Sequence, residues 1–246
     1  YDSVHGRLDQ KISSSQNAIF INKHRVNILN EPDLKNLNWK QFNIDVVVEC
    51  TGKFKTLEEN MLHIKAGAKK VLLSAPPSCP DVPMVVLGVN DHIVDFSRPV
   101  ISNASCTTNC AAPMINVLHE SLGLESAYVT TVHSFTSDQN LHDGIHEDLR
   151  RARSAGQSIV PTSTGASKSL EEIIPDLKGK VEGLAMRVPT PNVSLVDLVF
   201  TSKKKLSVKA INEAFKIASK KELKNILATT EEKLVSIDFN HNSNSA

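Results

Sequence analysis

Alternating apolar and polar positions predict a strand–helix–strand unit in the first part of the chain. The run NIDVVVECTG, residues 43–52, is β-branched and ends at a glycine, which is typical of a buried parallel strand. The following segment KTLEENMLHIKAG, residues 55–67, spaces its apolar residues as one face of a helix does. The runs KKVLLSAPP, residues 69–77, and VPMVVLGVN, residues 82–90, predict two more strands. This order predicts a right-handed crossover in a parallel sheet.

The pattern changes after residue 106. CAAPMINVLHESLG, residues 110–123, predicts an amphipathic helix that ends at its final glycine. SAYVTTVHSF, residues 126–135, alternates and predicts a strand, whereas DLRRARSAGQS, residues 148–158, predicts a basic loop. VEGLAMRVPTPNVSLVDLVFTSK, residues 181–203, predicts a pair of strands interrupted by prolines, and SVKAINEAFKIASK, residues 207–220, predicts a second amphipathic helix.

Composition narrows the class of protein. With 246 residues, 40% hydrophobic and 22% charged, the chain is long enough for one large domain or two ordinary ones. No apolar run is long enough to cross a bilayer, and the net charge of +1 does not favour nucleic acid or a membrane surface as the main partner. The first ten residues lack the features of a secretory signal. Four cysteines do not suit a disulfide framework, so we expect a reducing, cytoplasmic location.

The candidate chemistry lies in SNASCTTNCAAP, residues 102–113, where Cys106 and Cys110 are four residues apart. A metal site is disfavoured because no second Cys/His pair has matching spacing, and a redox couple normally has two intervening residues rather than three. Residues that favour the N-cap surround Cys106, which predicts that it begins a helix. The free N–H groups and the positive end of the helix dipole there favour a thiolate and can hold an oxyanion.

A nucleophilic cysteine also needs a base from elsewhere in the chain. His133, at the end of the strand predicted at residues 126–135, is the best-placed candidate. The alternative is that Cys106 is a small buried residue and His133 a hydrogen-bonded core histidine. The two residues by themselves fit both interpretations.

The longer motifs identify a family. SNASCTTNCAAP is followed by TTVHSFTSDQ, DLRRAR, IVPTSTGASK and GLAMRVPTPNVSLVDLVF, and it is preceded by YDSVHGR and VVVECTGKF. In this order and spacing, from residue 1 to about residue 238, the chain closely resembles the phosphorylating glyceraldehyde-3-phosphate dehydrogenases. The resemblance implies an α/β fold class: an incomplete Rossmann-type, parallel-sheet NAD(P)-binding domain at residues 1–104. An α+β catalytic domain with a mixed or antiparallel sheet is expected at residues 105–246.

The resemblance also implies roles for individual residues. Cys106 would attack the aldehyde of glyceraldehyde 3-phosphate, and His133 would polarise it and accept the hydroxyl proton as hydride passes to the nicotinamide. Inorganic phosphate would then cleave the thioester to give 1,3-bisphosphoglycerate. Cys110 matches the family's second cysteine, which is not catalytic.

Two anions take part in this reaction, so basic pockets are expected. Arginine suits phosphate because its planar fork donates two hydrogen bonds at once. The positions that match the family's substrate and phosphate pockets are Ser105, Thr107, Thr136, Asp138, Arg151, Thr164, Gly165 and Arg187. Without the resemblance, the arginines at residues 150–153 would be interpreted as a solvated basic face. The segment 135–157 matches a loop at a subunit contact of the family tetramer, so a homotetramer is expected.

The expected cofactor is NAD, with NADP as the alternative. The matching cofactor positions are Cys50, Thr51, Gly52, Phe54, Ser74 and Ala75. No G-x-G-x-x-G occurs in the chain, and the family places its glycine-rich turn upstream of residue 1 and further segments downstream. We therefore expect a fragment that, as it stands, neither binds NAD tightly nor turns over. Gly144-Ile145 replaces the Leu-Pro usual in NAD-preferring members, and Asn140 replaces a common arginine.

Three other functions fit parts of the sequence. An erythrose-4-phosphate dehydrogenase shares the scaffold, but such chains tend to alter the regions around Thr136, Thr164 and Gly165. A non-catalytic protein that retained the fold is favoured by a truncated chain and disfavoured by the set Cys106, His133 and Arg187. A Cys–His protease would need a peptide cleft in place of phosphate pockets.

Overall fold

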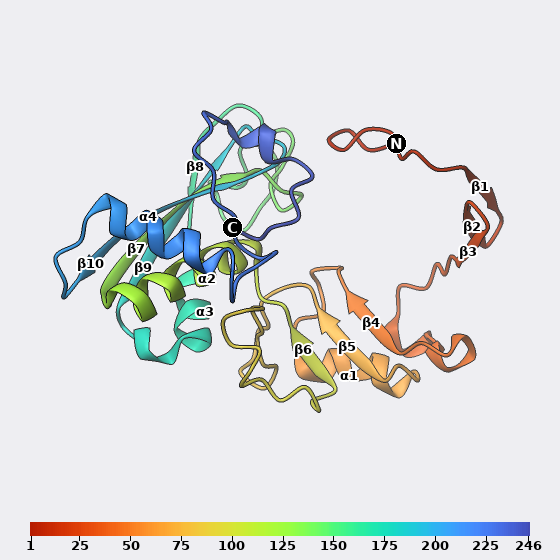
Figure 1. Cartoon of the computed structure of the whole chain (residues 1–246). Coiled ribbons are helices and arrows are strands. Elements are labelled where there is room, and N and C mark those ends of the chain that lie inside the picture. The colour runs from red at the N-terminus through yellow and green to blue at the C-terminus, as the bar shows by residue number, and fades with distance from the viewer.

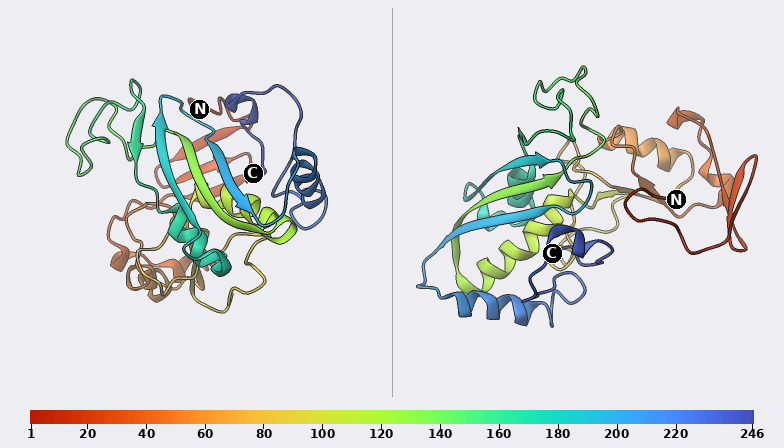
Figure 2. Two further views of the ribbon diagram at one scale, coloured as in Figure 1. Left: turned by 90° about the vertical axis from the view of Figure 1, so that its left-hand side faces the viewer. Right: turned by 90° about the horizontal axis from the view of Figure 1, so that it is seen from above.

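The computed structural model describes all 246 residues, which form three separate sheets (Figure 1). The first is a small antiparallel meander of β1 (Ile12–Ser15), β2 (Ala18–Ile21) and β3 (His24–Asn27). In Figure 1 and in the right view of Figure 2 it lies apart from the other two sheets, and Ala18 is its only buried residue. No pattern in the sequence predicted this meander, because its strands are short and their side chains are largely exposed.

The second sheet is parallel and consists of β4 (Val46–Glu49), β5 (Lys70–Leu73) and β6 (Val100–Ser102), in that order. Helix α1 (Leu57–Lys65) connects β4 to β5, as the sequence predicts. Its start is fixed by a capping box in which Thr56 and Glu59 exchange side-chain to backbone hydrogen bonds. Val47, Val71 and Val100 form a small core between this sheet and the helix.

The prediction of a third strand at residues 82–90 is wrong. That segment makes a single bridge, between Met84 and Ser102, and then turns, while β6 takes the third place in the sheet. The turn is closed by the side chain of Asn90, which accepts from the Val86 N–H at 2.8 Å and donates to the Met84 carbonyl at 2.9 Å. Most of its apolar residues are buried, so the apolar run indicated burial and not extended pairing.

The third sheet is mixed and lies in the second half of the chain. Its strands are β7 (Leu124–Ser134), β8 (Val160–Thr162), β9 (Val181–Val188) and β10 (Leu195–Ser202), in the order β10-β7-β9-β8. Strand β7 runs parallel to β9, and the other pairs are antiparallel. The two strands predicted at residues 181–203 are therefore confirmed, with β7 between them. Gly183 lets β9 approach β7 closely, since a Cβ there would meet the Val129 carbonyl oxygen at 2.4 Å.

Three helices cover one face of this sheet: α2 (Cys106–Leu122), α3 (Ala166–Ile173) and α4 (Val208–Ala218) (Figures 1 and 2). The largest core lies between them and the strands, around Ile115, Leu170 and Val129. Helix α2 ends at Gly123, whose φ of 69° is the left-handed cap expected of a glycine at that place. None of the chain's helices combines the length and the apolar character that a bilayer crossing requires.

Short 3₁₀ turns complete the chain: η1 (Leu34–Asn36), η2 (Trp39–Phe42), η3 (Pro175–Leu177) and η4 (Ser236–Phe239). The segment 148–158 forms turns with no helix or strand, as predicted. The α/β fold class, with a parallel sheet followed by a mixed one, is confirmed.

Candidate active site

Cys106 is the first residue of α2, the position that the surrounding cap residues predict. Ser105 is the N-cap, and its hydroxyl oxygen accepts from the Thr108 N–H at 3.1 Å. The Cys106 side chain is exposed, whereas Thr108 is buried. The helix therefore presents the sulfur to solvent at the end where its unpaired N–H groups point.

The approach to this cysteine is strained and tightly held. Ala104 has a φ of 59°, in the left-handed region that alanine seldom adopts. Its N–H donates to the Ser102 hydroxyl at 3.0 Å, and that hydroxyl donates to the Ala75 carbonyl at 2.7 Å. Such a conformation costs about 1–3 kcal/mol and persists where its surroundings fix it, often at functional sites.

His133 is the penultimate residue of β7, which is the longest strand of the chain. Its Nε2 is 3.2 Å from the Cys106 Sγ, and the residue is 8% exposed. The alternation of β7 turns His133 to the same buried face as Val129 and Thr131, the face that α2 covers. The structure thus brings together two residues that are 27 positions apart in the sequence.

This contact separates the chemistry of the two cysteines. The hydrogen bond from His133 is the main cause that lowers the pKa of Cys106 below its ordinary value, with help from the imidazole charge and the Thr107 N–H, while burial opposes the shift. Burial raises the pKa of Cys110 to about 11, and the nearby Cys106 adds to the effect. The thiolate therefore forms at lower pH at Cys106 than at Cys110, which remains a thiol near neutral pH.

The other nitrogen of His133 has two partners that compete. Nδ1 lies 2.7 Å from the Ser134 carbonyl and 2.8 Å from Arg187 Nη1. A carbonyl only accepts and a guanidinium only donates, so Nδ1 can bond to one of them at a time. Arg187 can donate to the same carbonyl, at 3.1 Å. With Nδ1–H on the carbonyl, Nε2 is free to take the thiol proton.

Arg187 stands beside His133 because of strand register: the two residues are partners in the parallel pair of β7 and β9. Its guanidinium also reaches the Thr136 hydroxyl at 3.4 Å. Its buried Nε has no hydrogen-bond partner. Burial, and next the charge of Arg151, lower the pKa of Arg187 below its usual range. A buried, unpaired N–H on a cation is a donor suited to an anionic ligand.

Arg151 is more fully engaged. Its Nη1 pairs with Asp138, and its Nε and Nη2 donate to the Thr162 hydroxyl at 3.0 and 2.7 Å. Asp148 lies 3.7 Å away. The structure thus joins Arg151 to Asp138, both predicted, and adds Thr162, which the sequence reasoning missed.

The remaining predicted anion positions lie at two helix starts. Ser105 and Thr107 flank Cys106. Gly165 is the N-cap of α3, and the Thr164 hydroxyl accepts from the Ala166 N–H at 3.1 Å. No hydrogen bond connects these two residues to either arginine.

The predicted cofactor positions lie at the carboxyl ends of β4 and β5, where open parallel sheets bind ligands. Cys50, Thr51 and Gly52 follow β4 and are exposed, and Ser74 and Ala75 follow β5. The Asn103 N–H donates to the Leu73 carbonyl at 3.1 Å, which ties the end of β5 to the segment that leads into Cys106.

These residues fit part of a dinucleotide. A hollow of about 410 Å³ lies next to the turn after β4, and its lining includes Phe54, Pro32 and Leu34. Ligand pockets commonly measure about 300–1,000 Å³ and are largely apolar. Asp33, Lys35 and Glu59 also line the hollow, so its polar edge carries groups of both charges.

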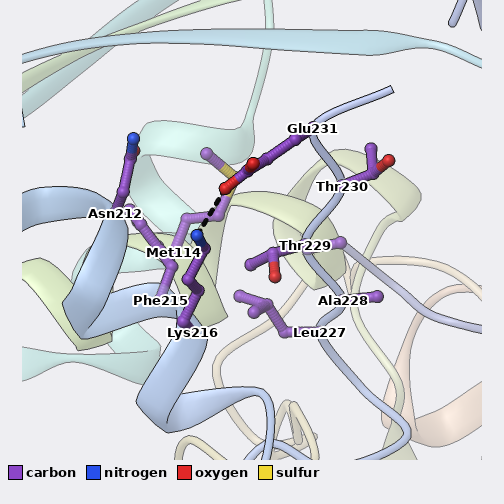
Figure 3. Close-up of a pocket in the computed structure, with 10 residues that line it drawn as sticks. Met114, Asn212, Phe215, Lys216, Leu227, Ala228, Thr229, Thr230 and Glu231 are labelled. Atoms are coloured by element: carbon purple, nitrogen blue, oxygen red, sulfur yellow. Dashed lines mark hydrogen bonds and ion pairs between the residues drawn. The ribbon is translucent and has the colours of Figure 1, made fainter. Parts of the chain in front are cut away.

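A second hollow, of about 270 Å³, lies between α2, α4 and the C-terminal segment (Figure 3). Met114, Phe215 and Leu227 provide apolar walls, and an ion pair of 2.5 Å between Lys216 and Glu231 crosses it. None of the predicted site residues lines it, so it has no place in the candidate chemistry.

Two features of the sequence point to further polar contacts. Glu49 ends an otherwise apolar strand, and a charged residue in such a run marks a buried polar contact. Thr162 lies in IVPTSTGASK, the motif that also contains Thr164 and Gly165. By contrast, the Ser134 carbonyl could not be found in this way, because backbone groups leave no trace in a sequence.

A parallel sheet with open strand ends, followed by a mixed-sheet half with a thiol–imidazole pair near the junction, is the architecture of a two-part nucleotide-dependent enzyme. Family comparison makes this specific. Residues 105–246 match the glyceraldehyde 3-phosphate dehydrogenase C-terminal domain, and residues 1–57 match the glyceraldehyde 3-phosphate dehydrogenase NAD binding domain. The chain belongs to the glyceraldehyde-3-phosphate dehydrogenase family.

Individual relatives agree. The chain is 51% identical to glyceraldehyde-3-phosphate dehydrogenase 2 of Bacillus subtilis, over 100% of this chain and 72% of that protein. It is 51% identical to glyceraldehyde-3-phosphate dehydrogenase of Geobacillus stearothermophilus, over 98% of this chain and 72% of that protein. A Staphylococcus epidermidis glyceraldehyde-3-phosphate dehydrogenase 2 is 47% identical, again over 72% of its length. The chain thus spans about 72% of the length of these relatives.

Proposed function

We propose that the protein oxidises and phosphorylates D-glyceraldehyde 3-phosphate to 1,3-bisphosphoglycerate with NAD, a step of glycolysis and gluconeogenesis. The observation that carries the proposal is the 3.2 Å contact between the Cys106 Sγ and His133 Nε2, in a chain of this family. A thiolate paired with an imidazolium is nucleophilic near neutral pH, and an aldehyde carbon is a suitable electrophile.

The chemistry uses one sulfur and one ring nitrogen. The Cys106 proton moves to His133 Nε2, and the thiolate forms a C–S bond to the aldehyde carbon. His133 returns its proton to the new alkoxide, which gives a thiohemiacetal, and then removes that hydroxyl proton as the C–H bond breaks. When bound, NAD accepts the hydride released in this step. A phosphate oxygen then attacks the thioester, the C–S bond breaks, and the thiolate is regenerated beside the imidazolium.

Arg187 is proposed to bind the phosphoryl group of the substrate or the attacking phosphate. Its unpaired buried Nε supports this role, and so does its position directly beside His133. Arg151 and Asp138 would shape the same pocket, together with Thr136. Ser105, Thr107, Thr164 and Gly165 would supply hydroxyl and N–H donors at the two helix starts.

NAD would be held in part by Cys50, Thr51, Gly52 and Phe54 after β4 and by Ser74 and Ala75 after β5. The exposed strand ends and the hollow beside Phe54 support this placement. NADP is the alternative that Gly144-Ile145 leaves open, and a titration with each dinucleotide decides between them.

A cytoplasmic homotetramer is proposed for the assembled enzyme. All four cysteines are free, which suits a reducing compartment. Leu141, Ile145 and Leu149 are exposed in the segment 135–157, and large apolar side chains gathered on one loop suggest a surface covered by another subunit. Light scattering of the full-length protein would give four times the subunit mass.

The activity is tested by following NADH formation by the full-length protein. The rate should require glyceraldehyde 3-phosphate, NAD and inorganic phosphate together. Erythrose 4-phosphate serves as the competing aldehyde, and faster turnover of it would replace the proposed substrate. No NADH with either aldehyde would contradict the proposed function.

A further inference from the structure

The parallel-sheet half contains an acid in its interior that the proposed chemistry does not use. Glu49, the last residue of β4, and His63, on α1, have side chains that are each 3% exposed. Charged groups are almost never buried this far unless they are paired. The alternation that buries Val47 also turns Glu49 inward. The two residues meet at 3.2 Å, between Glu49 Oε2 and His63 Nε2.

The hydrogen-bond direction in this pair follows from a third residue. The Trp39 indole Nε1 lies 3.1 Å from His63 Nδ1. An indole N–H can only donate, so Nδ1 must accept, and the ring proton must be on Nε2. Nε2–H therefore donates to Glu49. The chain of donors runs from Trp39 through His63 to the carboxylate, and both ring nitrogens are satisfied.

The other oxygen of Glu49 holds a turn. Glu49 Oε1 accepts from the Thr51 N–H at 2.7 Å and from the Thr51 hydroxyl at 2.5 Å. That hydroxyl accepts in turn from the Lys53 N–H at 3.2 Å. The Glu49 backbone carbonyl also accepts from the Ser74 N–H at 2.9 Å. One residue thus fixes both turns in which the cofactor positions lie.

We propose that Glu49, held by His63 and Trp39, is a positioning residue that keeps the Cys50–Lys53 turn in the shape that binds the dinucleotide. The inference rests on the proposed function, since it assigns the turn to NAD. It states that the buried chain sets the affinity for NAD and leaves the reaction at Cys106 unchanged once NAD is bound. Glu49 does not need to touch the cofactor, because it acts through Thr51.

The charge of Glu49 is required because every group around the carboxylate is a donor. Thr51 offers an N–H and a hydroxyl, and His63 offers Nε2–H. An amide at position 49 would direct its own N–H groups against one of these donors. His63 could relieve that conflict only by moving its proton to Nδ1, where the Trp39 N–H already points.

The first test is Glu49→Gln in the full-length protein, with the dissociation constant for NAD measured by calorimetry. We expect NAD binding to weaken about tenfold or more, as for a lost hydrogen bond to a charged group, and kcat at saturating NAD to stay within about twofold. Glu58→Gln is the matched control, because Glu58 is an exposed glutamate on α1, the helix that carries His63. It should leave both quantities unchanged.

The second test compares His63→Gln with His63→Leu. Glutamine can accept from Trp39 and donate to Glu49, whereas leucine can do neither. His63→Leu should weaken NAD binding and speed amide hydrogen exchange of the peptide that contains residues 50–53, measured without NAD. His63→Gln should restore both toward the wild-type values. If Glu49→Gln fails to fold, Trp39→Phe, which keeps an aromatic ring but removes the N–H that donates to His63, takes its place and should weaken NAD binding.

The proposal is overturned if these variants lower the melting temperature but keep NAD affinity and exchange at residues 50–53 equal to the Glu58→Gln control. The buried chain would then only support the core. NAD binding and exchange are measured without the substrate, so they decide this inference even if the wild-type protein does not oxidise glyceraldehyde 3-phosphate. That result would instead contradict the proposed function.

Discussion

The two buried histidines of this chain, His63 and His133, illustrate how partners decide what an imidazole can do. His63 lies between an indole N–H, which only donates, and a carboxylate, which only accepts while ionised. The ring proton of His63 is therefore fixed on Nε2. His133 faces an ionisable thiol at one nitrogen, and a carbonyl and a guanidinium at the other. The partners of His133 allow a proton on either ring nitrogen, and proton transfer to and from the thiol requires this freedom.

The polar groups around the two histidines also differ in whether they have hydrogen-bond partners. In the network of His63, both ring nitrogens and both Glu49 oxygens have partners. Around His133, the Cys106 side chain is exposed and the buried Nε of Arg187 has no partner. The network of His63, in which all these groups have partners, can fix the conformation of the turn. The network of His133 keeps an unpaired donor that a ligand can bind. Burial and residue type alone would not have separated the two.

The strongest test of the open site is Cys106→Ser compared with Cys110→Ser. A serine hydroxyl is not ionised by the neighbouring imidazole, so we expect the steady-state rate of NADH formation to fall by roughly four orders of magnitude or more. Cys110→Ser should keep the rate within about threefold, because its thiol is not ionised at neutral pH and takes no part in the reaction. Equal losses in the two variants would contradict the assignment of the nucleophile.

Substituting each histidine in turn is the direct test of the comparison between His63 and His133. His133→Asn removes the proton acceptor and should slow acylation about 10²–10⁴-fold in single-turnover measurements. His63→Gln should leave the acylation rate at saturating NAD unchanged. If His133→Asn kept the wild-type acylation rate, His133 would have a structural role only, as is proposed for His63.

Arg187→Gln tests whether the open donor serves an anion. A lost charge-assisted hydrogen bond to phosphate should raise the KM for substrate or for inorganic phosphate about 10–100-fold. Arg151→Gln should have a smaller effect, since Asp138 and Thr162 already occupy the Arg151 donors. The two KM values are measured separately at saturating NAD. A larger effect at Arg151 would reverse the assignment of the two arginines.

The pH dependence of alkylation gives the finest distinction. The pKa of Cys106 is lowered mainly by its hydrogen bond with His133, so its thiolate persists to lower pH than that of an ordinary thiol. The rate of iodoacetamide labelling at Cys106 should therefore level off at lower pH than at Cys110. In His133→Asn the Cys106 inflection should move to higher pH. Peptide mass spectrometry reports the two sites separately, and faster labelling of Cys110 would contradict the prediction.

Periodicity predicted the elements that alternate strongly. Helices α1, α2 and α4 and strands β4, β5, β7, β9 and β10 fall where the sequence placed them. The meander of β1 to β3, the three-residue strands β6 and β8, and helix α3 were missed. Strands β1 and β3 are exposed and mostly polar, so they lack the apolar run that marks β4 and β5, which are equally short. Residues 82–90 were misassigned because an apolar run reports burial, and the side chain of Asn90 instead closes a turn there.

The site was predictable to a different degree in each part. The cap residues around Cys106 placed it at a helix start, and this is a local property of the sequence. Its pairing with His133 depends on how α2 packs against β7, so the residues alone left it open. The position of Arg187 beside His133 depends on a strand register that joins residues 54 positions apart. Local patterns do not encode such a register.

The short link between β6 and α2 has a mechanical consequence. The chain passes once from the parallel sheet to the mixed sheet, through Asn103, Ala104 and Ser105, and the sulfur comes directly afterwards. Met84, Val86 and Val89, which precede β6, also lie in the core around Ile115 and Val129, so packing joins the two halves as well as this link does. The sulfur therefore follows a segment that is anchored to both sheets, and its position relative to each of them is fixed by the same short stretch of chain.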